Sequence, residues 1–441
     1  MIVLLTTTLG INMVKVGATR ISINSKTYQE GNTNLVLNKI LSDNELKQEL
    51  PHMFNYASNG NYINSSYEEL NDSDYVTEGL YSNVDEDGTT YYYRGNINNN
   101  NLQFGAYDED YYVYQGKKAQ YYQSQESCEE AGNSDCSAVK LASAGDKMYW
   151  KIVRVNGDGS IRLIYNGTSS SPSNSESASS FSVGYVPYNL KDNEPKYTGY
   201  TYDNGTDSFI KRKIDTWYNN TLGKNSNYDS MVILGRFCSD SSGYQDGRVF
   251  GSDYAFASMV RLGQFETNFV NSNAPTFMCP VTSESYGGSY RLKAGLITAD
   301  ELVFSGENFY VEVNSYLNSG ESNYWYWSMT SFDLNHGGGD VWTIGSDLEA
   351  NAVDYEDFVR PVINVVTNNY KLNGNGTMEN PYTLQAVEPE ESGSVDNNQE
   401  NSFTNPETRS MIAIGITIGL IIVLGTGAFV IYRKKMKKLK K

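Results

Sequence analysis

The segment from Met148 to Gly167, MYWKIVRVNGDGSIRLIYNG, carries the clearest fold signal in the chain. Residues Tyr149 to Val155 alternate in the period of two that a β-strand requires, and Ser160 to Tyr165 alternate in the same way. Between them, Asn156-Gly157-Asp158-Gly159 supplies residues that tolerate the positive φ angles of a tight turn. The segment therefore predicts an antiparallel β-hairpin.

Short runs rich in Tyr, Val and Ile continue this pattern from Tyr75 onward, separated by Asn, Gly and Asp. Asp85-Glu86-Asp87-Gly88 precedes Thr89 to Arg94 (TTYYYR) and predicts a second hairpin turn. Val359 to Val366 (VRPVINVV) is largely apolar and predicts a buried strand, in which Arg360 is expected to pair with an acidic side chain.

Helical patterns are few. Asn34 to Leu50 (NLVLNKILSDNELKQEL) carries apolar residues at helical spacing, and Pro51 is expected to end this helix. Ile210 to Leu222 (IKRKIDTWYNNTL) predicts an amphipathic helix. Ser169 to Ser180 is rich in Ser and predicts a surface loop.

The C-terminal region predicts a membrane anchor. Met411 to Tyr432 is an uncharged apolar run, and a helix of that length rises about 33 Å, enough to cross a hydrocarbon core of roughly 30 Å. Arg433 to Lys441 (RKKMKKLKK) holds seven basic residues and no acid, which favours a cytoplasmic tail. We therefore expect a transmembrane helix with everything before Met411 outside the cell.

The residues Asn405, Pro406, Glu407, Thr408 and Arg409 precede this run. With the apolar run and basic tail, they resemble the cell-wall sorting signal of Gram-positive surface proteins, in its Asn-Pro-x-Thr variants. Arg409 stands where Gly or Asn is usual. The resemblance implies a sortase as a partner, with cleavage after Thr408. The alternative is a permanent single-pass anchor behind an ordinary stalk, and both place the protein at the cell membrane or cell wall.

The expected organisation has six parts. At the amino terminus, Met1 to Gly10 is apolar without a preceding basic segment, which favours a truncated signal peptide over a short buried strand. The parts are a signal-like segment (1–25), a helical or irregular extension (26–74), an extracellular domain (75–385), a disordered stalk (386–410), the span (411–432) and the tail (433–441).

The negative charge of the chain disfavours nucleic acid and anionic lipid as partners. The chain has a formal net charge of -18, and without the seven basic tail residues 27 basic residues face 52 acidic residues. Such a surface repels nucleic acid and anionic lipid. The 36 Tyr and 16 Phe residues are sufficient for a large core, so a wholly disordered chain is also excluded.

The four cysteines are Cys128, Cys136, Cys238 and Cys279. An even number in an exported chain predicts two disulfides, and pairing within each couple avoids joining distant segments, although three connectivities are possible. Zinc is the rival interpretation. It is disfavoured because neither couple has CxxC spacing and both histidines lie elsewhere.

Several motifs occur in order between Tyr75 and Leu384 and together resemble a domain of uncharacterised surface proteins of low-GC Firmicutes. Its distal half is similar to the C-type-lectin-like fold shared with formylglycine-generating enzymes. The resemblance implies an α+β domain with two small sheets, short antiparallel strands, few helices and long loops. The motifs are Gly79 to Gly95, Met148 to Gly167, Phe237 to Asp240, Ala294 to Gly306, Tyr324 to Ser331, Phe358 to Val365 and Gly374 to Leu384.

The family's chemistry does not transfer. Formylglycine-generating enzymes use a cysteine pair near their last strands, whereas no cysteine follows Cys279 here. The Glu-Pro-Asn, Gln-Pro-Asp and Trp-Asn-Asp segments of calcium-dependent lectins are missing. The chain has only two histidines, His52 and His336, and no GxSxG motif, so a Ser-His-Asp catalytic triad is disfavoured. A pair of catalytic carboxylates, as in a glycosidase, stays open as an alternative. We expect no catalytic residues.

Tyr324, Trp325, Tyr326 and Trp327 are the main ligand-binding candidates, because alternation along a strand places one pair on a face that a ligand contacts. The alternative is a core strand with one face under a loop. His336 and Asp340 flank three glycines and are further candidates, against the simpler interpretation of a loop tip. Asp85, Asp87 and Gly88 match part of a calcium loop, but a hairpin turn also accounts for them.

We therefore expect a surface-anchored, adhesin-like binding protein without a cofactor, although a calcium ion stays open. Its non-catalytic ectodomain would recognise a glycan or a surface protein. A structural component of the cell envelope is the alternative, and a surface hydrolase is a further one.

Overall fold

The computed structural model divides the chain into two compact units, Met1–Val387 and Glu388–Lys441. All described residues belong to the first unit. They are residues 34–50, 53–54, 78–115, 121–122, 129, 136–170, 181–243, 254–262, 275–280, 287–308, 315–318, 324–335 and 338–387. The predicted signal segment, the span, the tail, the sorting motif Asn405 to Arg409 and nearly all of the stalk lie outside them.

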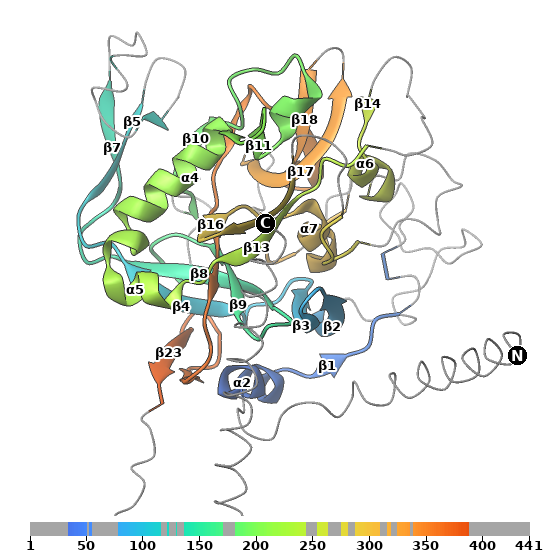
Figure 1. The fold of residues 1–441 in the computed structure, drawn as a ribbon. Coiled ribbons are helices and arrows are strands. Elements are labelled where there is room, and N and C mark those ends of the chain that lie inside the picture. The colour runs from blue at the N-terminus through green and yellow to red at the C-terminus, as the bar shows by residue number, and fades with distance from the viewer. Residues whose placement is uncertain are drawn as a thin grey trace, which may run out of the picture. The chain divides into compact units, whose positions relative to one another are not determined.

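A ten-stranded mixed sheet forms the larger layer of the first unit (Figure 1). Its main path runs in the order β1-β2-β3-β8-β4-β23-β22, and β9, β21 and β16 continue from β8. The strands are β1 (Leu46–Lys47), β2 (Gly79–Asp85), β3 (Gly88–Arg94), β4 (Asn101–Ala106), β8 (Lys147–Val155), β9 (Ile161–Tyr165), β16 (Ala294–Gly295), β21 (Val362–Val365), β22 (Tyr370–Asn373) and β23 (Tyr382–Ala386).

A six-stranded sheet has the order β10-β20-β17-β18-β19, with β14 paired to β17. It comprises β10 (Tyr185–Pro187), β14 (Tyr254–Ala255), β17 (Tyr326–Asn335), β18 (Gly338–Ile344), β19 (Leu348–Ala352) and β20 (Glu356–Phe358). Three small sheets complete the described strands: β5 (Tyr111–Gln115) with β6 (Tyr121–Tyr122) and β7 (Ser137–Ala142), β11 (Thr201–Tyr202) with β12 (Thr206–Asp207), and β13 (Gly235–Ser239) with β15 (Gly288–Leu292).

Helices are short and few in the described part of the chain. The longest, α4, has 12 residues. The helical segments are α2 (Leu35–Asp43), α4 (Phe209–Asn220), α5 (Ser226–Met231), α6 (Ala257–Leu262), α7 (Ala299–Ser305), and the 3-10 turns η3 (Pro195–Thr198) and η4 (Leu222–Lys224).

Both predicted hairpins are confirmed. Strands β8 and β9 pair antiparallel, and the backbone N–H of Asn156 donates to the Ser160 carbonyl at 2.8 Å to close the turn, with Gly159 at φ 85°. Strands β2 and β3 pair from Gly79↔Arg94 to Asp85↔Gly88. The predicted buried strand is also confirmed, because β21 is fully buried and pairs with β9.

The two predicted helices exist, but one is shorter than expected. Ser208 caps α4, and the apolar residues of this helix face the core as its periodicity predicts. Asn34 caps α2, which ends at Asp43 rather than continuing to Leu50. The end comes early because Leu46–Lys47 forms β1, which adds a parallel edge strand to β2.

One hydrophobic cluster joins the two large sheets with α2, α4 and α7. Trp150 of β8, Tyr165 of β9 and Trp217 of α4 meet at ring-centroid distances of 5.4, 5.7 and 6.4 Å. The indole N–H of Trp150 donates to the Phe104 carbonyl at 2.7 Å, so this large ring is buried without an unsatisfied donor. The aromatic richness of the sequence is therefore used mainly in the interior.

The expected α+β class, with a C-type-lectin-like domain and a terminal transmembrane helix, is wrong. The described chain is mostly strands with five short α-helices, arranged around one ten-stranded and one six-stranded sheet. The resemblance depended on strand motifs, which do not determine how many strands join each sheet. No helix in the described ranges is both long and apolar enough to span a bilayer.

One predicted disulfide is confirmed. Cys238 of β13 and Cys279 are bonded, with 5.3 Å between their Cα atoms. Cys136 is also disulfide-bonded, and Cys128 lies outside the described residues. Disulfides persist in oxidising compartments, so this bond is consistent with an extracellular protein.

Candidate functional site

The predicted aromatic stretch is only partly accessible. Tyr326 and Trp327 are completely buried. The Tyr326 hydroxyl donates to the Leu317 carbonyl at 2.9 Å, and the Trp327 indole donates to the Val186 carbonyl at 2.8 Å. These two side chains therefore belong to the core, whereas Tyr324 and Trp325 are half-buried.

The remaining predicted ligand contacts do not join them in a pocket. Asp340 is half-buried on β18 and lies opposite Ala352 of β19. His336 lies outside the described residues. None of the five described candidates lines the large cleft beside α4 or the two small cavities next to Arg236.

A cleft of about 480 Å³ lies between the β4–β5 connection and the C-terminal end of α4. We call it the tyrosine–carboxylate cleft. Its volume falls in the range of small-molecule sites, roughly 300 to 1,000 Å³. Figure 1 shows β5 and β7 on the side of the large sheet where α4 ends. The lining residues are Tyr107, Asp108, Glu109, Asp110, Tyr111, Tyr112, Asn219, Asn220, Thr221 and Lys224.

The β4–β5 connection is held from both sides. On the α4 side, the Lys224 ammonium contacts the Glu109 carboxylate at 2.6 Å, and the Asn225 amide donates to Asp108 at 3.2 Å. On the β7 side, the Ala144 backbone N–H donates to Asp110 at 2.9 Å, and this hydrogen bond lowers the pKa of the Asp110 carboxyl. The acidic turn is therefore positioned by contacts with segments far along the chain.

The cleft has a buried floor and an exposed aromatic rim. Tyr107 is buried, and its hydroxyl lies 2.9 Å from the Tyr165 hydroxyl and accepts from the Trp217 indole at 3.4 Å. Burial raises the pKa of Tyr107 to about 12, so the floor is uncharged at neutral pH. Tyr112 is 39% exposed, and its hydroxyl donates to Asp110 at 3.1 Å.

Several polar groups of the cleft are available to a ligand. Asn219 and Asn220 are exposed at the end of α4 and make no side-chain hydrogen bond within the described chain. The Tyr111 hydroxyl also has no hydrogen-bond partner in the described chain, but it is buried and is therefore not one of these groups. Amide donors and acceptors beside carboxylates and aromatic rings suit a molecule with many hydroxyl groups.

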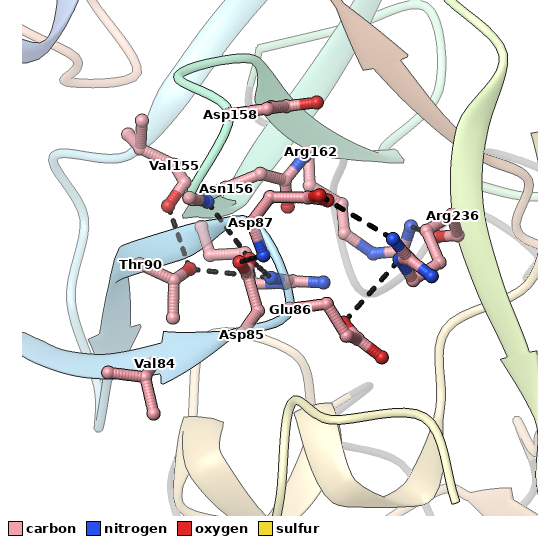
Figure 2. A network of polar contacts seen from close by, with 12 residues as sticks. Val84, Asp85, Glu86, Asp87, Thr90, Val155, Asn156, Asp158, Arg162 and Arg236 are labelled. Carbon is pink, nitrogen blue, oxygen red and sulfur yellow. Dashed lines mark hydrogen bonds and ion pairs between the residues drawn. The ribbon is translucent and has the colours of Figure 1, made fainter. Parts of the chain in front are cut away.

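A separate charged network lies within the large sheet (Figure 2). Arg154 contacts Asp85 at 2.7 Å and Glu301 at 3.0 Å, and Arg162 contacts Glu301 at 2.6 Å. Burial alone would raise the pKa of Glu301, but the guanidinium groups of Arg162 and Arg154 lower it below its usual range. Glu301 also completes a capping box with Thr298 at the start of α7. The network therefore serves the fold.

The cavities at the outer edge of this network, beside Arg236, are too small to hold a ligand. Arg236 lies 3.5 Å from both Glu86 and Asp87, as Figure 2 shows. The two cavities next to Arg236 each have a volume of about 10 Å³, space for a single water molecule.

Asp85 is a hairpin residue rather than a metal ligand. One of its carboxylate oxygens accepts from the backbone N–H groups of Asp87 and Gly88, and the other accepts from Gly157 and Arg154. More generally, no group of three or more His, Cys, Asp or Glu side chains suited to a metal ion occurs among the described residues.

Three buried ionisable groups lie on different elements. Burial lowers the pKa of Lys213 on α4 to about 8, and raises the pKa of Glu307 after α7 to about 8 and that of Asp357 on β20 to about 7. No hydrogen bond or ion pair in the described chain joins any two of them. They do not form an acid–base pair of the kind that catalysis requires.

Sequence reasoning missed the tyrosine–carboxylate cleft. The run Asp108 to Tyr114 (DEDYYVY) was visible, but the opposite wall comes from α4, and Glu109 and Lys224 are 115 residues apart. Comparisons with known proteins give no match among protein-family models, curated proteins or solved structures. The function is therefore inferred from the residues of the site.

Proposed function

We propose that this chain is an exported, non-catalytic binding protein, displayed at the cell surface, that recognises a glycan at the tyrosine–carboxylate cleft. The observation that carries the proposal is the cleft itself. Its volume of about 480 Å³ is suited to a small ligand, whereas the two cavities next to Arg236 have room only for water.

The lining chemistry supports a sugar. Tyr112 offers an exposed ring on which the apolar face of a pyranose stacks. Asn219 and Asn220 offer free amides, and Asp108 offers a carboxylate that accepts from hydroxyl groups. Vicinal hydroxyl groups of a sugar match such paired donors and acceptors.

Export is supported by the Cys238–Cys279 disulfide, because structural disulfides are rare in reducing compartments. The acidic composition supports a partner that is neither nucleic acid nor an anionic surface. The three buried groups with pKa values near neutral, Lys213, Glu307 and Asp357, are separate from one another, and none of them lines the cleft.

The test is a screen of the full chain against glycan and extracellular-matrix arrays, with and without chelator. Tyr112→Ala is expected to weaken glycan binding by about tenfold, because it removes the exposed stacking surface. Tyr355→Ala is the matched control, since Tyr355 is 62% exposed and does not line the cleft.

Binding that survives Tyr112→Ala unchanged would refute the cleft as the site. Loss of binding in chelator would show a calcium requirement. Silence on every array, combined with self-association of the chain, would favour the structural envelope role instead.

A further inference from the structure

We infer that the glycan bound in the tyrosine–carboxylate cleft carries a protonated amino group, as an amino sugar without N-acetylation does. This inference rests on the proposed function, because it names the ligand class of the same cleft. The cavity and its tyrosine and amide lining define the site, and the balance of charge around it selects among sugars.

The cleft carries excess negative charge. Among the described residues of its lining, Asp108, Glu109 and Asp110 are acidic and Lys224 alone is basic. Lys224 forms an ion pair with Glu109 at 2.6 Å. Asp110 forms an ion pair at 3.3 Å with Lys140, which does not line the cleft. A sulfated, phosphorylated or carboxylated sugar would therefore be repelled by these carboxylates, and no unpaired cation among the described lining residues would offset that repulsion.

Asp108 is the carboxylate that a ligand cation would meet. Its contacts within the described chain come from the neutral Asn225 amide, at 3.2 and 3.5 Å to its two oxygens. An uncharged donor leaves the negative charge of Asp108 uncompensated, whereas an ammonium group on the ligand forms a charge-assisted hydrogen bond with it.

The tyrosines add to this preference. Tyr107 and Tyr111 lie with ring centroids 5.7 Å apart, and Tyr112 exposes its ring at the rim. The face of an aromatic ring attracts a cation, so the exposed Tyr112 ring and the Asp108 carboxylate favour the same ligand charge. A neutral N-acetyl group satisfies neither preference.

The experiment compares two probes that differ by their acetyl groups: the β-1,4-linked glucosamine trisaccharide and its fully N-acetylated form. Affinities for the full chain are measured by calorimetry at about pH 6, where the free amines are protonated. The amino form is expected to bind about fivefold or more tightly, with a preference that shrinks as salt screens the charges.

Asp108→Asn is expected to remove this preference by weakening the amino form about fivefold more than the acetylated form, because the Asn amide oxygen still accepts from hydroxyl groups but carries no charge. Asp354→Asn is the matched control, because Asp354 is exposed and does not line the cleft. Thermal unfolding of each variant verifies that it is folded, and the comparison of the two probes on the unmodified chain requires no variant.

Equal or tighter binding of the acetylated trisaccharide would overturn the inference while leaving the cleft as a glycan site. A preference for the amino form that persists in Asp108→Asn would also overturn it, because a residue other than Asp108 would then bind the ammonium group of the ligand. If neither probe binds and Tyr112→Ala has no effect on any array ligand, the proposed function fails together with the inference.

Discussion

At the scale of single residues, Lys213 is a charge that the interior does not compensate. It is 5% exposed on α4, and its ammonium has no hydrogen-bond partner in the described chain. The side chain packs closely against the backbone of Gly184, since its Cε lies 3.0 Å from the position that a Cβ would occupy there. A buried ammonium without a partner destabilises the folded state, because the desolvation cost is not returned by an opposing charge.

Lys213→Met is therefore expected to increase the free energy of unfolding by about 1 to 3 kcal/mol at pH 7. The folded-state pKa of Lys213 is about 8 against its ordinary value of 10.5. Between these values the unfolded chain binds more protons, so the stability of the unmodified protein should rise with pH across this window. Urea unfolding at several pH values measures both effects.

The difference between the two proteins should shrink as pH rises from about 8 to about 10.5, because deprotonation removes the same charge that the mutation removes. Lys371→Met is the control, since Lys371 is an exposed residue of β22. A less stable Lys213→Met protein would show that the amine has a partner in the folded state.

Other residues show what a local pattern leaves open. Arg360 was expected to pair with an acid, but its guanidinium donates to the Tyr165 and Leu317 carbonyls and to the Asn166 amide oxygen. It also lies 4.8 Å from the Tyr326 ring centroid. The sequence predicts that Arg360 is in a buried strand, but its partners come from segments folded against that strand.

At the scale of elements, the segment of residues 275–280 is held by a small set of contacts. Phe277 stacks on Phe304 at 3.8 Å and lies 4.7 Å from the Arg154 guanidinium. The backbone N–H of Thr276 donates to Asp300 at 2.9 Å, and Cys279 is bonded to Cys238. The Cys279 backbone N–H also donates to Glu86 at 2.6 Å, and Phe277 packs on Tyr92 with ring centroids 5.4 Å apart. Ordering the backbone of this segment costs roughly 1 to 2 kcal/mol per residue, and the disulfide lowers that cost by cross-linking the unfolded chain.

Replacing Cys238 and Cys279 together with Ala is expected to lower the free energy of unfolding by about 4 kcal/mol, from the loss of a cross-link that spans 41 residues. Hydrogen exchange should also accelerate around α7, against which Phe277 packs. Treatment of the unmodified protein with reductant is the companion measurement. An unchanged urea midpoint in the double variant would contradict the prediction.

Elements with short sequence separation were the most predictable. The β8–β9 and β2–β3 hairpins followed from turn residues between alternating runs, and α4 followed from its apolar spacing. The strand β1 was not predicted, because two residues carry no periodicity and its partner β2 lies far along the chain. The cleft was not predicted for the same reason: its two walls meet only in three dimensions.

At the scale of the whole molecule, the sequence motifs did not determine how many strands each sheet contains or in which order they lie. The ten-stranded sheet brings β23 beside β4, and the six-stranded sheet connects to it through shared core residues and through the Met329 N–H, which donates to the Ile297 carbonyl at 2.7 Å. The α+β expectation failed because it assigned these strands to two small sheets.

Because one hydrophobic cluster connects both sheets, the first unit is expected to unfold in a single cooperative transition. Calorimetry should give equal calorimetric and van't Hoff enthalpies, and fluorescence of the buried Trp150 and Trp342 should change together with far-UV circular dichroism. Two resolved transitions would show that the sheets are separate folding units.

The pairing of β23 with β4 has a mechanical consequence. The chain leaves the first unit after Val387, immediately beyond β23, and the cleft begins immediately beyond β4. The two strands are parallel, with Tyr382 opposite Leu102 and Thr383 opposite Gln103, so their C-terminal ends lie at the same end of the pair. A pulling force applied between a bound ligand and the following chain would therefore act across this short strand pair and not across the rest of the fold. The hydrogen bonds of the pair would break one after another, so β4 and β23 are expected to separate before any other part of the first unit unfolds.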